Sequence, residues 1–89
     1  MILNFENTPL QKFDTVINEI NYTFQAKYNA SHSFWVLDII SNDFAVYGIK
    51  IVSGINICEP YSFIPFSLIS NDLEDPILSN LKSFRLEVI

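Results

Sequence analysis

A strict alternation of apolar and polar side chains over residues 20–28 limits the folds open to this chain. The apolar positions of this stretch are Ile20, Tyr22, Phe24, Ala26 and Tyr28. A period of two over nine residues is typical of a β-strand with one buried face. Residues 12–17 precede it across the polar step Asn18-Glu19. We therefore expect the two segments to pair as an antiparallel hairpin.

A second hairpin is predicted for residues 33–40 and 44–52. Residues 33–40 carry apolar side chains on both faces, which is typical of a central strand or of a strand covered by a partner. The polar turn 41–43 joins the two strands. Gly48 interrupts the second strand, so we expect a β-bulge or a close backbone approach there.

The remaining segments are shorter. We expect an edge strand in residues 1–5, a strand in 66–70 and a closing strand in 83–89. At most one short helix is expected, near residues 76–81 after Pro76. The aromatic stretch 61–66 contains proline and is expected to be an edge or a loop.

Length and composition favour one small, mainly β domain over residues 1–89. The chain has 89 residues, 49% of them hydrophobic and only 17% charged. Surface scaling predicts roughly 5,400 Å² of accessible surface for a domain of this size. The expected fold is a small antiparallel β-barrel or β-sandwich built of hairpins, with at most the one short helix. One cysteine excludes an intramolecular disulfide.

Charge and hydropathy bear on the choice of partners. The net charge is −5, and the five basic residues are spread along the chain. This pattern disfavours nucleic acid and anionic membrane surfaces as partners. The most apolar stretch, residues 44–58, is interrupted by polar residues, so we expect no transmembrane helix.

Few residues suggest chemistry. His32 is the single histidine, and it could serve Cys58 as a base only if the fold brought the two together. Asp38 lies in an otherwise apolar strand, where we expect it to bind a turn or a backbone amide. A small enzyme using Asp38 or Cys58 stays open as an alternative. We otherwise expect no catalytic residue, no metal and no cofactor.

Aromatic residues point instead to protein–protein contacts. Tyr61, Phe63 and Phe66 are candidates for an interface, although aromatic residues also fill small β cores. The acidic segment 71–76 gives a different alternative, a small acidic inhibitor or adaptor that binds another protein through this loop.

The order of several motifs resembles the baseplate plug family of contractile-tailed bacteriophages. The chain has Tyr28-Asn29, then Phe34-Trp35-x-Leu37-Asp38, then a segment from Gly48 to Gly54-Ile55-Asn56-Ile57, and finally Asn80-Leu81 before Arg85-Leu86. Asn56 stands where the family tends to have aspartate, and Lys82 stands where glycine is common. The resemblance covers nearly the whole chain.

The resemblance implies a structural virion protein without catalytic residues. It implies a position on the tail axis at the baseplate, contacts with the hub and the tail tube, and a symmetric ring of identical copies. Such a protein would be assembled in the cytoplasm of the bacterial host and would need no nucleic acid or membrane. The residues to which the resemblance assigns structural roles are Tyr28, Asn29, Phe34, Trp35, Leu37, Asp38, Gly48 and Gly54.

Overall fold

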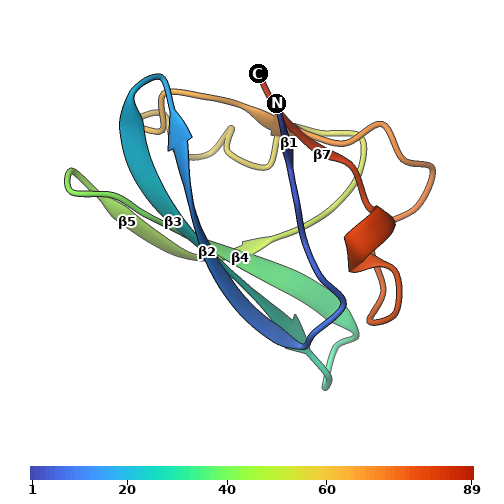
Figure 1. Ribbon diagram of the computed structural model, residues 1–89. Coiled ribbons are helices and arrows are strands. Elements are labelled where there is room, and N and C mark those ends of the chain that lie inside the picture. The colour runs from blue at the N-terminus through green and yellow to red at the C-terminus, as the bar shows by residue number, and fades with distance from the viewer.

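The computed structural model describes all 89 residues and contains two antiparallel sheets (Figure 1). The four-stranded sheet runs in chain order through β2 (Leu10–Ile17), β3 (Ile20–Asn29), β4 (Phe34–Ile40) and β5 (Ala45–Lys50). The three-stranded sheet has the order β1 (Ile2–Leu3), β7 (Leu86–Val88) and β6 (Leu68–Ile69). The prediction of a mainly β fold is confirmed. The strands form two separate sheets, and no closed barrel is present.

Both predicted hairpins are confirmed. In β2–β3 the register pairs Ile17 with Ile20 and Phe13 with Phe24. Asn18 and Glu19 form the turn with φ of 51° and 68°. Two left-handed residues match the natural twist of paired strands, which explains why a two-residue connection is sufficient.

The core lies between the sheets, and β4 is at its centre. Trp35, Leu37 and Ile39 point inward and have no exposed surface. Leu68 from β6 and Leu86 from β7 belong to the same apolar cluster. The accessible surface is 5391 Å², which agrees with the size expected for one core of this length.

The three-stranded sheet brings the two ends of the chain together, as Figure 1 shows. The Val88 amide donates to the Met1 carbonyl over 2.7 Å. The expected strand near the N-terminus is present as β1, at the edge of this sheet. The predicted strands 66–70 and 83–89 are confirmed as the shorter β6 and β7.

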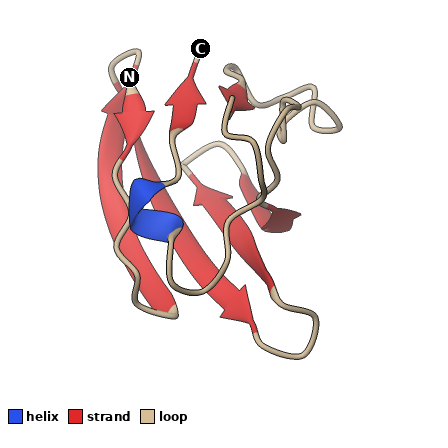
Figure 2. Ribbon diagram, turned by 90° about the vertical axis from the view of Figure 1, so that its right-hand side faces the viewer, coloured by secondary structure: helices blue, strands red, loops and turns tan.

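The single short helical segment begins at the end of the predicted range 76–81 and not within it. It is the 3₁₀ turn η1 (Leu81–Ser83), seen in Figure 2. The indole Nε1 of Trp35 donates to the Ile77 carbonyl over 2.8 Å, and the Asn80 side chain accepts from the Ile77 amide. These bonds hold residues 77–80 in a turn, and the helical turn begins only where Leu81 enters the core.

Candidate assembly surfaces

Asp38 is held between β3 and β5. Its Oδ1 accepts a hydrogen bond from the Gly48 amide at 2.9 Å, and its Oδ2 lies 3.0 Å from the Lys27 ammonium. The Asp38 side chain is 1% exposed, whereas that of Lys27 is 44% exposed. Burial of a carboxylate is costly unless it is paired and hydrogen-bonded, and here both conditions are met.

Gly48 lies in a β-bulge. Leu37 pairs with Ile49 and Ile39 pairs with Val46, so two residues of β5 oppose Asp38 alone. Gly48 has a φ of +77°, which favours glycine. The extra residue lets both Val46 and Ile49 point into the core, although they are three positions apart.

The Tyr28-Asn29 pair shapes the loop between β3 and β4. The Asn29 Oδ1 accepts from the amides of Ser31 and His32 at 3.1 and 3.2 Å. The ring of Tyr28 packs edge-on against Trp35, with centroids 5.4 Å apart. Asn29 thus fixes the shape of the loop, and the adjacent Tyr28 packs against the core residue Trp35.

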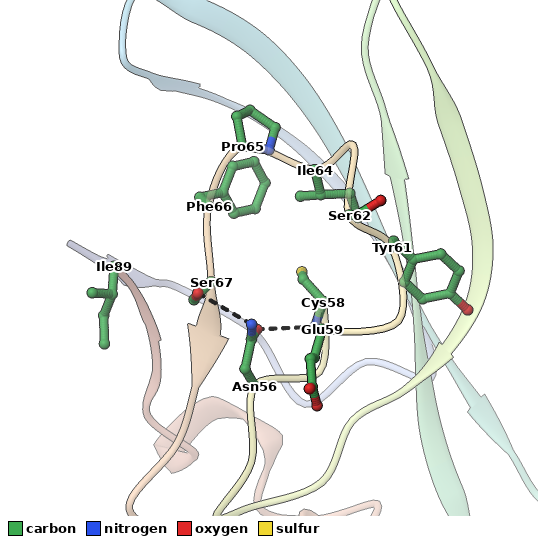
Figure 3. A pocket seen from close by; sticks show the side chains of 10 residues that line it. All are labelled: Asn56, Cys58, Glu59, Tyr61, Ser62, Ile64, Pro65, Phe66, Ser67 and Ile89. Atoms are coloured by element: carbon green, nitrogen blue, oxygen red, sulfur yellow. Dashed lines mark hydrogen bonds between the residues drawn. The ribbon is translucent and has the colours of Figure 1, made fainter.

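Asn56 organises the loop between β5 and β6. Its Oδ1 accepts from the amides of Cys58 and Leu68, both at 3.0 Å, and its Nδ2 donates to the Ser67 hydroxyl at 3.1 Å. Figure 3 shows Asn56 at the side of a hollow of about 370 Å³ beneath this loop. Near the start of this loop, Gly54 has a φ of +83°, and its amide donates to the Ser70 carbonyl.

The three aromatic residues expected at an interface divide into two groups. Phe63 is 56% exposed and Tyr61 is half-buried, and their rings pack edge-on with centroids 6.3 Å apart. Phe66 is only 7% exposed, and its ring packs on Tyr22 in the core. The assignment of Phe66 to an interface is therefore corrected, because its side chain is already covered within one chain.

Two carboxylates of the acidic segment 71–76 accept hydrogen bonds from backbone amides of the same chain. The Asp72 carboxylate accepts from the Arg85 amide, and that of Asp75 accepts from the Ser53 amide, both at 2.9 Å. Glu74 is exposed and makes no hydrogen bond or ion pair. Leu73 beside it is fully exposed.

The residues considered for catalysis lie in unlike surroundings. Cys58 is buried, and burial raises the pKa of its thiol to about 11. His32 is exposed in the β3–β4 loop, where its ring contacts Phe34. No group of three or more His, Cys, Asp or Glu side chains is arranged to hold a metal ion. The three-residue η1 is far too short to cross a membrane, and the chain has no other helix.

Two features were missed at the level of sequence. Asn56 was noted only as a departure from a motif, and the polar residue between Ile55 and Ile57 was the one signal of its role. The lysines are spread along the sequence, yet the register places Lys12, Lys27 and Lys50 on the same side of the four-stranded sheet. Only the strand pairing reveals that grouping.

Comparison with known proteins identifies a family. The model of the family described as cyanophage baseplate Pam3 plug gp18 matches residues 1–87 of the chain. No curated protein matches the sequence.

Proposed function

The chain belongs to the family of the cyanophage baseplate Pam3 plug gp18, and from this premise we propose that it lies on the tail axis, near the tail tube and the hub. Membership makes it a structural protein of the phage virion, located in the tail baseplate and in contact with other baseplate proteins. The observation that carries the proposal is the extent of the match, which covers both sheets and every strand except the last residue of β7.

The proposed mode of action is assembly rather than catalysis. We propose a symmetric ring of identical copies that also contacts the hub and the tail tube. Each copy would be a single plug-like domain formed by residues 1–89, assembled in the cytoplasm of the bacterial host. No nucleic acid or membrane takes part in this arrangement.

The surface of the chain supports a role in assembly. Eleven large apolar side chains are exposed, Tyr47, Ile55 and Phe63 among them. The strands β2 and β5 are the unpaired edges of the four-stranded sheet. Exposed apolar side chains and free strand edges are what a subunit needs to contact neighbours on more than one side.

Within this proposal, the motif residues have structural roles. Asp38 and Gly48 hold the β-bulge, Tyr28 and Asn29 shape the β3–β4 loop, and Gly54 begins the loop that carries Tyr61 and Phe63. In β4, Trp35 and Leu37 fill the core and Phe34 supports Lys50, whose ammonium lies 4.9 Å from its ring centroid. Tyr61 and Phe63 are proposed to contact the hub or the tail tube.

Electron cryomicroscopy of purified tails tests the position and the symmetry. We expect density for this chain on the tail axis, in several symmetry-related copies between the hub and the tube. Density only at the periphery of the baseplate would contradict the axial position, and a single asymmetric copy would contradict the ring. Mass spectrometry of the same tails tests the baseplate role itself, which fails if the chain is absent.

The inhibitor alternative is not supported by the family match. Two of the three carboxylates in the 71–76 segment accept hydrogen bonds from this chain's own backbone, which leaves Glu74 as the one free acid. The enzyme alternative would need an ionised thiol or a reactive acid. The raised pKa of Cys58 and the ion pair of Asp38 favour neither.

A further inference from the structure

On the outer face of the four-stranded sheet, the side chains are exposed or half-buried, except for that of Asp38. A row of cross-strand neighbours crosses this face from β2 to β5, formed by Leu10, Lys27, Val36 and Lys50. Lys12 lies on the same side one pair further along β2. We call this surface the lysine face, and it includes Phe34, on whose ring the Lys50 ammonium rests.

The charge of the lysine face differs in sign from the rest of the molecule. It bears three lysines and two acids, Asp14 and Asp38, which gives +1. The other ten charged residues are two basic and eight acidic, which gives −6 and accounts for the total of −5. Lys27 is already paired with Asp38, but Lys12 and Lys50 have no carboxylate within 4 Å.

A matching surface lies in the segment between β6 and η1. Its apolar side chains are open to solvent: Leu73 is 100% exposed, Ile77 is 55% exposed and Leu78 is 43% exposed. Beside Leu73, the Glu74 carboxylate is free. We call residues 73–78 the acidic tip. It presents apolar side chains with a negative charge, whereas the lysine face presents apolar side chains with positive charges.

The two surfaces lie on opposite sides of the molecule. In Figure 1 the acidic tip is in the loop at the right, beside η1, and the four-stranded sheet is at the left and below. Figure 2, viewed from that right-hand side, shows η1 in front and the sheet behind it. Two different complementary surfaces on opposite sides produce head-to-tail contacts, which close into a ring when the rotation between copies permits it.

We propose that the acidic tip of one copy docks on the lysine face of the next copy. In this contact Leu73 packs among Leu10, Phe34 and Val36. The Lys12 and Lys50 ammonium groups, on the two edge strands β2 and β5, lie on either side of this apolar patch and attract the Glu74 carboxylate. The occupant is a second copy of this chain because the required charge and apolar groups are both present on its far side. The inference rests on the proposed ring and identifies its interface.

Photocrosslinking in assembled tails tests the contact. Leu73 is replaced by p-benzoylphenylalanine, tails are purified and irradiated, and crosslinked peptides are identified by mass spectrometry. We expect a product of twice the chain's mass, joined to peptides that contain residues 10–12 or 34–50. The same replacement at Ser62 serves as the control and should give no such product. Ser62 is exposed and lies between Tyr61 and Phe63 in residues 61–66, which we call the aromatic loop.

Charge variants supply a second readout. The double variant Lys12→Glu/Lys50→Glu should lower the yield of the chain–chain product at least tenfold, because it places acids opposite Glu74. The matched variant Lys82→Glu reverses a charge outside the lysine face and should leave the yield unchanged.

The two proposals fail in different ways. If the chain is present in tails but position 73 crosslinks only to other proteins, to a different surface of the chain, or to nothing, the docking contact is overturned and the baseplate role stands. An equal yield in the lysine variants also overturns the contact. If the chain is absent from purified tails, the proposed function fails and the contact fails with it.

Discussion

Gly48 and Asp38 together decide where β5 departs from regular pairing. The backbone at Gly48 has a φ of +77°, and the amide of the same residue donates to the Asp38 carboxylate. That acid is in turn paired with Lys27. The bulge therefore depends on the backbone conformation of Gly48, on the hydrogen bond from its amide to Asp38, and on the ion pair of Asp38 with Lys27. These three contributions can be tested by separate variants.

Gly48→Ala should lower the free energy of unfolding by about 1–2 kcal/mol, because a side chain disfavours the left-handed conformation. No atom lies within 4 Å of the added Cβ, so the loss would come from the backbone and not from a clash. Gly48→Asn is the matched control and should lose less, since asparagine tolerates this conformation. Urea unfolding measures both, and an unchanged stability of the alanine variant would show that the bulge relaxes at no cost.

Cys58 should make the protein less stable in alkali. Burial raises the pKa of its thiol to about 11 from 9.0, so the unfolded chain loses this proton at lower pH than the folded chain. The unfolded state then binds fewer protons between about pH 9 and about pH 11, and the free energy of unfolding falls by about 2 kcal/mol over that range.

The measurement compares urea unfolding of the wild-type protein and of Cys58→Ala at both ends of this pH range. The variant is less stable throughout because a buried side chain is shortened, but its loss between the two pH values should be smaller. Tyr22, whose pKa is also raised by burial and by nearby Asp43, is present in both proteins and cancels in the difference. Parallel pH profiles would mean that the thiol is accessible to water.

Among the elements, the loop between β5 and β6 depends on one side chain. Asn56 supplies an acceptor for two backbone amides and a donor for Ser67. Asn56→Ala leaves both amides without that acceptor and should cost about 2–4 kcal/mol. Asn56→Asp keeps the acceptors and lets the Ser67 hydroxyl donate in return, so its stability should remain within about 1 kcal/mol of the wild type.

Thermal or urea unfolding of the two variants checks this prediction, and hydrogen exchange at the amides of Cys58 and Leu68 locates the effect. Faster exchange at both amides is expected in Asn56→Ala only. If both variants lose the same stability, the donor to Ser67 matters more than the two acceptors.

The elements differ in how far local sequence determines them. The β2–β3 hairpin could be predicted because its alternation, its turn and its pairing all lie within residues 10–29. The helical turn was misplaced because residues 77–80 form a turn that is fixed in part by the Trp35 indole, 42 positions away, which donates to the Ile77 carbonyl. The role of Asn56 was missed for the same reason, since Leu68 lies twelve positions further along the chain.

At the scale of the whole molecule, alanine variants of Phe63 and Phe66 separate assembly from stability. Both were expected at an interface, yet only Phe63 is exposed. Phe63→Ala should change the free energy of unfolding by less than about 1 kcal/mol but lower the amount of chain in purified tails about tenfold. Phe66→Ala should cost about 3–5 kcal/mol of stability because it leaves a cavity in the core.

Urea unfolding and quantitative mass spectrometry of tails separate the two effects. Normal incorporation of Phe63→Ala would remove the aromatic loop from the proposed contacts with the hub or the tube. A stable Phe66→Ala would indicate that the loop collapses onto the space left by the ring.

The bulge in β5 has a consequence for the time between synthesis and assembly. A flat, regular edge strand can be extended by any other exposed strand, and a protein made in many copies would then be at risk of forming fibres. The bulge bends β5 and interrupts its regular hydrogen-bonding groups at Tyr47-Gly48. A strand of another chain could therefore pair with only a short stretch of β5. The extra residue that lets both Val46 and Ile49 point into the core therefore also shortens the run of β5 that another strand could extend.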